Sequence, residues 1–98
     1  MRELDEDLWR IVTECNFGTV WSRPGLSLRD RELACMSILL ALGAPGISIH
    51  FKNAHTVGIS DEELKELVLQ AIPYAGLPKV LQAMSILRRI QRGEAPSL

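Results

Sequence analysis

Cysteine is scarce in this chain, which holds only Cys15 and Cys35 among its 98 residues. Two cysteines are too few for a disulfide scaffold, and their spacing is not that of metal ligands. We therefore expect reduced thiols and a cytoplasmic location. An excess of basic charge is also lacking, because 11 basic residues face 12 acidic ones and the net charge is −1. A general nucleic-acid binder, which needs a basic stripe, is not expected.

Long hydrophobic runs are lacking as well. The N-terminus is acidic and has no apolar stretch of the signal-peptide kind. The segment Leu33–Phe51 contains no Asp, Glu, Lys or Arg, but Gly43, Pro45 and Gly46 interrupt it. Its unbroken apolar piece, Ile38–Leu42, is far shorter than the ~20 residues of a membrane-spanning helix. We expect a buried helix followed by a turn, and no contact with a membrane.

Hydrophobic residues make up 47% of the chain, and they recur at the three- and four-residue spacing of helices. No stretch alternates apolar and polar residues as a half-buried strand does. The sequence predicts one all-α domain, residues 1–98, whose segment 16–26 is a connector and whose Pro73 kinks a helix. The five expected helices cover about 5–15, 27–42, 46–57, 60–75 and 78–92.

The expected helix over 27–42 is apolar on every side, from Leu33 through Leu42. Ser27 is suited to cap its start, and Gly43 is suited to a left-handed C-terminal cap. A helix that is apolar all round must be buried all round. A chain of 98 residues can hardly enclose such a helix, so we infer that neighbouring subunits help to cover it.

Few residues could carry chemistry. His50 and His55 lie five apart on a helix, about 140° around its axis, which argues against a shared metal site. His50 is either a core histidine satisfied by a backbone group or a general acid–base group. Cys35 is expected to be inert packing. Tyr74, after the expected kink, is either a core residue or a hydroxyl aimed into a cleft.

Trp21 lies on the expected connector with Phe17. Large aromatic side chains on a connector can be plugs over a core or the lip of a pocket. Trp21 also lies in the first of several stretches that together resemble, over about residues 17–90, the carboxymuconolactone decarboxylase-like family, which includes the AhpD-type alkyl hydroperoxidases. The stretches are VWSRPGLSLR (20–29), ALG (41–43), His50 eight residues before Gly58, ISDEEL (59–64) and YAGLP (74–78).

The resemblance implies an all-helical homo-oligomer, a trimer or hexamer, with a pocket at subunit contacts. The peroxidase branch of the family uses a Cys-x-x-Cys pair with a histidine four positions later. On this chain the cysteine positions hold Gly43 and Gly46, and the histidine position holds His50. A thiol peroxidase needs a thiolate to attack the peroxide, so the resemblance favours the decarboxylase branch.

The decarboxylase branch implies a small carboxylated lactone or related acid as substrate, with no organic cofactor and no metal. His50 is then the expected proton donor. The family's glutamate precedes the first cysteine position by about a dozen residues, and Glu32 lies one position off that spacing. Glu32 is therefore the second expected catalytic residue. Arg23, beside Trp21, is the expected carboxylate-binding residue, with Tyr74 as a weaker candidate. Two alternatives stay open: a redox protein using Cys35 or Cys15, and a non-catalytic oligomeric binding protein.

Overall fold

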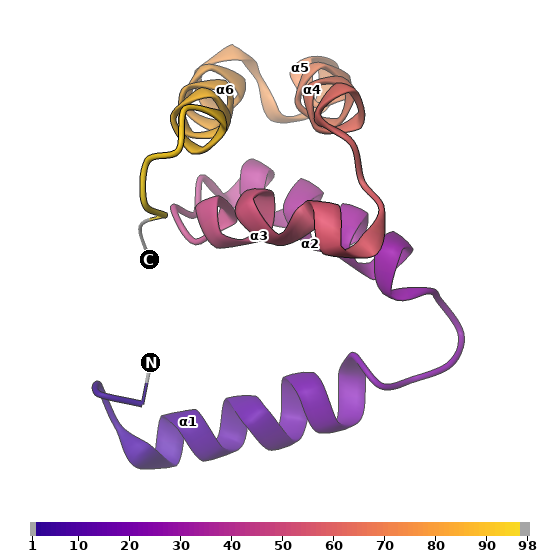
Figure 1. The fold of residues 1–98 in the computed structure, drawn as a ribbon, viewed down its shortest axis with the longest axis vertical. Helices are drawn as coiled ribbons and strands as arrows, with labels where there is room; N and C mark the ends of the chain where they lie inside the picture. The colour runs from indigo at the N-terminus through magenta and orange to yellow at the C-terminus, as the bar shows by residue number, and fades with distance from the viewer. Residues whose placement is uncertain (1, 97–98) are drawn as a thin grey trace.

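The computed structural model describes residues 2–96 and shows a chain of helices joined by turns (Figure 1). No strand occurs within these residues, so the all-helical prediction is confirmed. The α-helices are α1 (Glu6–Val12), α2 (Leu28–Leu42), α3 (Ile47–Asn53), α4 (Asp61–Gln70), α5 (Ile72–Ala75) and α6 (Leu77–Gln91). Two further helical segments are η1 (Thr13–Val20), a π-helix, and η2 (Ala54–Val57), a 3₁₀-helix.

Both ends of α2 follow the expected capping chemistry. The Ser27 hydroxyl accepts a hydrogen bond from the backbone N–H of Asp30 at 3.0 Å, which satisfies one free donor of the first turn. Gly43 ends the helix at φ 69°, in the left-handed region that a side chain disfavours. The chain then turns through Pro45 and begins α3, so α2 and α3 are consecutive and packed together.

The start of α4 is tied to the start of α2. Ser60 and Glu63 form a capping box, in which each side chain bonds the other's backbone N–H. Glu63 also forms an ion pair with Arg29 of α2. The hydrogen bond from the Ser60 backbone, followed by the Arg29 guanidinium, lowers the pKa of the Glu63 carboxyl below its usual value. This pair aligns the N-terminal ends of two core helices.

The Pro73 kink takes the form of a break between two helices. α4 ends at Gln70, and the short α5 resumes at Ile72. Proline lacks the N–H needed to continue the α4 hydrogen-bond ladder, and its ring clashes with the preceding turn. Gly76 then allows a sharp reversal at φ 88° into α6.

The core lies where α4 and α6 pack on the layer formed by α2 and α3 (Figure 1). Each of these helices contributes side chains that are almost completely buried, because each has one apolar stripe facing the centre. The core comprises Met36, Leu40, Ile47, Phe51, Ala54, Ile59, Leu64, Val68, Val80, Ala83, Ile86 and Leu87. Within the described residues, no helix is long and apolar enough to cross a membrane.

The N-terminal helix differs from the prediction. The expected connector from Asn16 is helical as far as Val20, since η1 continues α1 without a break. Gly18 suggested a loop, but the wider π-turns accommodate it, with the Trp21 N–H donating to the Asn16 carbonyl at 2.6 Å. No residue of α1 or η1 is buried, and Figure 1 shows this helix apart from the α2–α6 core.

The helix α2 is only partly covered by its own chain. Met36 and Leu40 are buried, but Ile38 is 60% exposed and Leu42 is 68% exposed. The inference that this helix is buried all round is therefore not met within one chain. Other large apolar side chains are also exposed on α1 and α6, including Ile11 and Leu81. These surfaces are what a partner subunit would have to cover.

Candidate active site

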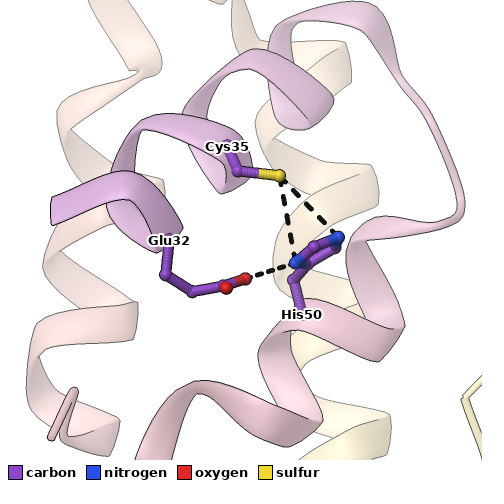
Figure 2. Close-up of side chains that lie close together, drawn as sticks. All are labelled: Glu32, Cys35 and His50. Carbon is purple, nitrogen blue, oxygen red and sulfur yellow. Dashed lines mark hydrogen bonds and ion pairs between the residues drawn. The ribbon is translucent and has the colours of Figure 1, made fainter. Parts of the chain in front are cut away.

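Glu32 and His50 meet at the contact between α2 and α3. The turn after Gly43 folds α3 back along α2, so that Glu32 Oε1 contacts His50 Nδ1 (Figure 2). The Glu32 side chain is only 14% exposed, and His50 is 31% exposed. A carboxylate at Nδ1 favours a proton on that nitrogen and orients the ring, leaving Nε2 for another partner.

Cys35 is the third member of this cluster. Its Sγ lies 3.9 Å from Nδ1 and 3.7 Å from Nε2 of His50. Dashed lines mark both contacts in Figure 2. Burial, followed by the nearby Glu32 charge, raises the pKa of the Cys35 thiol above its usual value. Sequence reasoning assigned Cys35 to inert packing and did not place it beside His50. The available signal was its spacing of three from Glu32, which places both side chains on one face of α2.

Trp21, the residue that directly follows η1, contacts the same histidine. Its ring stacks on the His50 ring, with a centroid distance of 6.5 Å and an interplanar angle of 19°. Trp21 also lines a cavity of about 340 Å³ between α2 and the segment after η1. Trp21 was expected either to plug the core or to form the lip of a pocket, and its place in the cavity lining supports the second interpretation.

The cavity is mostly apolar, and it reaches His50 through two of its wall residues, Trp21 and Cys35. The full lining is Val20, Trp21, Leu26, Arg31, Ala34, Cys35, Ile38 and Leu39. Arg31 is the only member of this set with a permanent charge. Its Nη2 donates to the Arg23 carbonyl at 2.8 Å, whereas its buried Nε has no hydrogen-bond partner among the described residues. Sequence reasoning did not select Arg31.

Two of the expected substrate-binding residues lie elsewhere. Arg23 supplies its carbonyl to Arg31, but its side chain is not part of the cavity wall. Tyr74 is 82% exposed and borders a separate hollow of about 210 Å³ beside α2 and α4. The structure therefore brings together Trp21, Glu32 and His50, and leaves Arg23 and Tyr74 outside the cavity.

The cluster has donor atoms of three kinds. One oxygen of Glu32, the sulfur of Cys35 and one nitrogen of His50 all lie within 4.8 Å of one another. A metal bound here would require the Cys35 thiol to lose its proton. The second histidine is not involved, because His55 pairs with Asp61 at 3.0 Å. The Glu32–His50 contact is explained without an ion, as a carboxylate–imidazole pair.

The raised pKa of Cys35 has a measurable consequence for its reactivity. In a Cys15→Ser background, we expect iodoacetamide to alkylate Cys35 slowly at pH 7, with a rate that still rises above the usual thiol pKa. The physical reason is that the thiolate is the nucleophile, and burial together with Glu32 disfavours it. Mass spectrometry over a pH series provides the rate. Cys15, which is exposed, serves as the reference in a Cys35→Ser protein, and equal rates at both cysteines at pH 7 would contradict the expectation.

Comparison with known proteins gives two relatives and a family model. The model of the carboxymuconolactone decarboxylase family matches residues 6–89. A 4-carboxymuconolactone decarboxylase from Acinetobacter baylyi is 34% identical over 91 residues, which cover 92% of this chain and 68% of that protein. A nitrosuccinic acid decarboxylase from Metarhizium robertsii is 32% identical over 80 residues, which cover 81% of this chain and 56% of that protein. The chain thus spans about two thirds of the first relative and just over half of the second.

Proposed function

Because the chain belongs to the carboxymuconolactone decarboxylase family, we propose that it is a decarboxylase of a small carboxylated lactone or a related small acid. Both relatives are named as decarboxylases, which supports a carboxy-lyase-like activity. The observation that carries the proposal is the Glu32–His50 pair placed against two wall residues of the cavity. A positioned proton donor beside an apolar cavity suits a reaction that releases CO2 and protonates carbon.

The proposed reaction needs one bond broken and one formed. The carbon–carbon bond to the leaving carboxylate breaks, its electron pair stays on the substrate carbon, and CO2 departs. An electron-withdrawing group of the substrate, such as a lactone carbonyl or a nitro group, delocalises that pair. His50 then gives a proton to the carbon, forming the C–H bond, and recovers a proton from solvent. Glu32 stabilises the protonated imidazole and holds its orientation.

Trp21 is the substrate-binding residue with the best support, since it both lines the cavity and stacks on His50. Its flat face suits a planar ring or a conjugated acid, because offset stacking is favourable for aromatic surfaces. Arg23 and Tyr74, proposed from the resemblance, receive no support from the cavity lining. No organic cofactor or metal is required by this scheme.

The redox alternative has one observation in its favour, which is the position of Cys35 beside His50. Two features oppose it. The pKa of Cys35 is raised, which keeps the thiol protonated, whereas peroxidase chemistry needs a thiolate. The Cys-x-x-Cys positions of the peroxidase branch hold Gly43 and Gly46, and both cysteines of this chain are free. We therefore keep the decarboxylase as the proposed function.

We also propose that the active form is a homo-oligomer, a trimer or hexamer, in which another copy covers the exposed apolar surfaces. Support comes from Ile38, which lines the cavity and is 60% exposed in the single chain. The open side of the cavity would then lie close to a neighbouring subunit. A non-catalytic oligomer, the remaining alternative, provides no role for the partly buried Glu32–His50 pair.

The proposed function is tested by measuring CO2 release from candidate acids. We expect the protein to accelerate CO2 loss from 4-carboxymuconolactone or from nitrosuccinic acid, the acids named for its relatives. Product formation is followed by NMR, with heat-inactivated protein as the control. If neither acid nor a panel of related lactones and nitro acids loses CO2 faster than in that control, the decarboxylase proposal fails.

A further inference from the structure

Cys35 is the member of the Glu32–Cys35–His50 cluster that lines the cavity. Neither Glu32 nor His50 is among the described residues that form its wall. The wall is otherwise apolar, apart from the Trp21 indole and the Arg31 guanidinium. The proposed scheme gives Cys35 no role, although an acid in the cavity contacts the wall residue Cys35 and reaches His50 only past it.

Among the described wall residues, the Cys35 thiol is the one group that can give up a proton near neutral pH. An arginine guanidinium stays charged in proteins, and an indole N–H donates hydrogen bonds without ionising. Burial, followed by the Glu32 charge, raises the pKa of the Cys35 thiol, so the sulfur keeps its proton until a strong base reaches it. The carbanion left behind by departing CO2 is such a base.

His50 lies beside this thiol and can supply a second proton. The Cys35 Sγ is 3.7 Å from His50 Nε2, which is within hydrogen-bond reach of a sulfur atom. Glu32 occupies the other ring nitrogen, Nδ1, so the protonated ring has Nε2–H free to donate to Sγ. A sulfur that accepts this bond leaves its own S–H available to the cavity. The Glu32 charge also disfavours a thiolate, which favours the return of a proton to sulfur.

From this arrangement we propose that the Cys35 thiol delivers the proton to the substrate carbon, and that His50 supplies its proton to the carbon through this thiol rather than directly. This inference rests on the proposed decarboxylase function and adds one step to its scheme. The S–H bond breaks while the electron pair of the carbanion forms the new C–H bond, and the S–H electron pair stays on sulfur. The proton on His50 Nε2 then moves to the thiolate, and solvent restores the imidazolium. Sulfur returns to a thiol, so no oxidant or reductant is consumed.

The test measures CO2 release and C–H bond formation separately, by mass spectrometry of the gas and by NMR of the product. Nitrosuccinic acid, the acid named for one relative, suits this purpose, because its carbanion is a nitronate. A nitronate absorbs ultraviolet light and takes up a proton slowly in mildly alkaline buffer. The wild-type protein should form one C–H bond for each CO2 and release the neutral nitro acid. With Cys35→Ala, formation of that bond should slow about 100-fold or more, and nitronate should accumulate in solution.

Cys35→Ser tests the acidity of this side chain at nearly constant volume, and it keeps the test available if the alanine variant is unstable. A serine hydroxyl is a much weaker acid than a thiol, so this variant should also accumulate nitronate. Cys15→Ser is the matched control, because Cys15 is exposed and lies outside the cavity wall, and it should behave as the wild type does. Circular dichroism and a thermal melt check that each variant is folded.

These measurements separate the role of the thiol from the function on which it rests. If both Cys35 variants form the neutral nitro acid as fast as the wild type, the thiol has no catalytic role and the decarboxylase stands. The same conclusion follows if CO2 release and C–H formation fall in equal proportion without nitronate, because Cys35 then only shapes the cavity. If 4-carboxymuconolactone is the acid turned over, the same two rates are compared, with deuterium uptake from D2O marking the C–H bond. No CO2 release from either acid by the wild type would overturn the decarboxylase and this step together.

Discussion

Replacing His50 by glutamine is expected to slow CO2 release by about 10²–10⁴-fold while the melting temperature stays nearly unchanged. The loss in rate follows from removing the proton donor. The small effect on stability follows from geometry, because a glutamine amide can still donate to the Glu32 carboxylate that contacts His50. Steady-state kinetics and a thermal melt on the same preparation measure both quantities.

A purely structural histidine would give the opposite pattern. Turnover would be retained, and a glutamine too poorly placed to satisfy the partly buried Glu32 would cost about 1–3 kcal/mol, which corresponds to a fall of several degrees in the melting temperature. His55→Gln is the control, since His55 is exposed and pairs with Asp61 outside the cavity. A His50→Gln protein that melts much earlier but keeps its turnover would remove His50 from the mechanism.

Placing a charge on the N-terminal helix, by Ile11→Glu, is expected to dissociate the protein and to lower its melting temperature by roughly 10 °C. Ile11 is 57% exposed in the single chain, and no residue of α1 is buried. An isolated helix of this length is marginal in water, so its order must come from packing. Burial of one such side chain contributes about 1.5–3 kcal/mol, and a charge at that position opposes it further.

Analytical ultracentrifugation provides the assembly state, and melts at several protein concentrations provide the linkage between assembly and stability. Thr13→Glu is the matched control, because Thr13 is exposed and lies about 200° from Ile11 around the helix axis. A wild-type protein that sediments as a folded monomer at micromolar concentration, with a concentration-independent melt, would contradict the proposed oligomer.

The limits of α2, its capping and the break at Pro73 could all be predicted from sequence, because each depends on local chemistry. Ser27, Gly43 and Pro73 act on the backbone within one turn of their own position. The π-helix from Thr13 to Val20 could not be predicted in this way. Its hydrogen bonds span five residues, and a single glycine within it resembles the beginning of a loop.

The site shows the same division between local and long-range information. The resemblance placed His50 and Glu32 in the site, but their contact depends on how α3 folds back along α2. The sequence offered several arginines near Trp21, and it could not reveal which of them faces the cavity. Arg23 lies closer to Trp21 along the chain, yet Arg31 lines the wall because it falls on the same helical face as Cys35.

The continuous helix α1–η1 ends directly at Trp21, whose ring stacks on His50. The helix whose exposed apolar side chains we propose as a subunit contact is therefore directly joined to Trp21, which stacks on the proposed proton donor His50. If another subunit orders this helix, substrate binding and subunit association share one thermodynamic cycle. Each must then strengthen the other by the same factor, and a substrate held against Trp21 becomes an effector of quaternary structure.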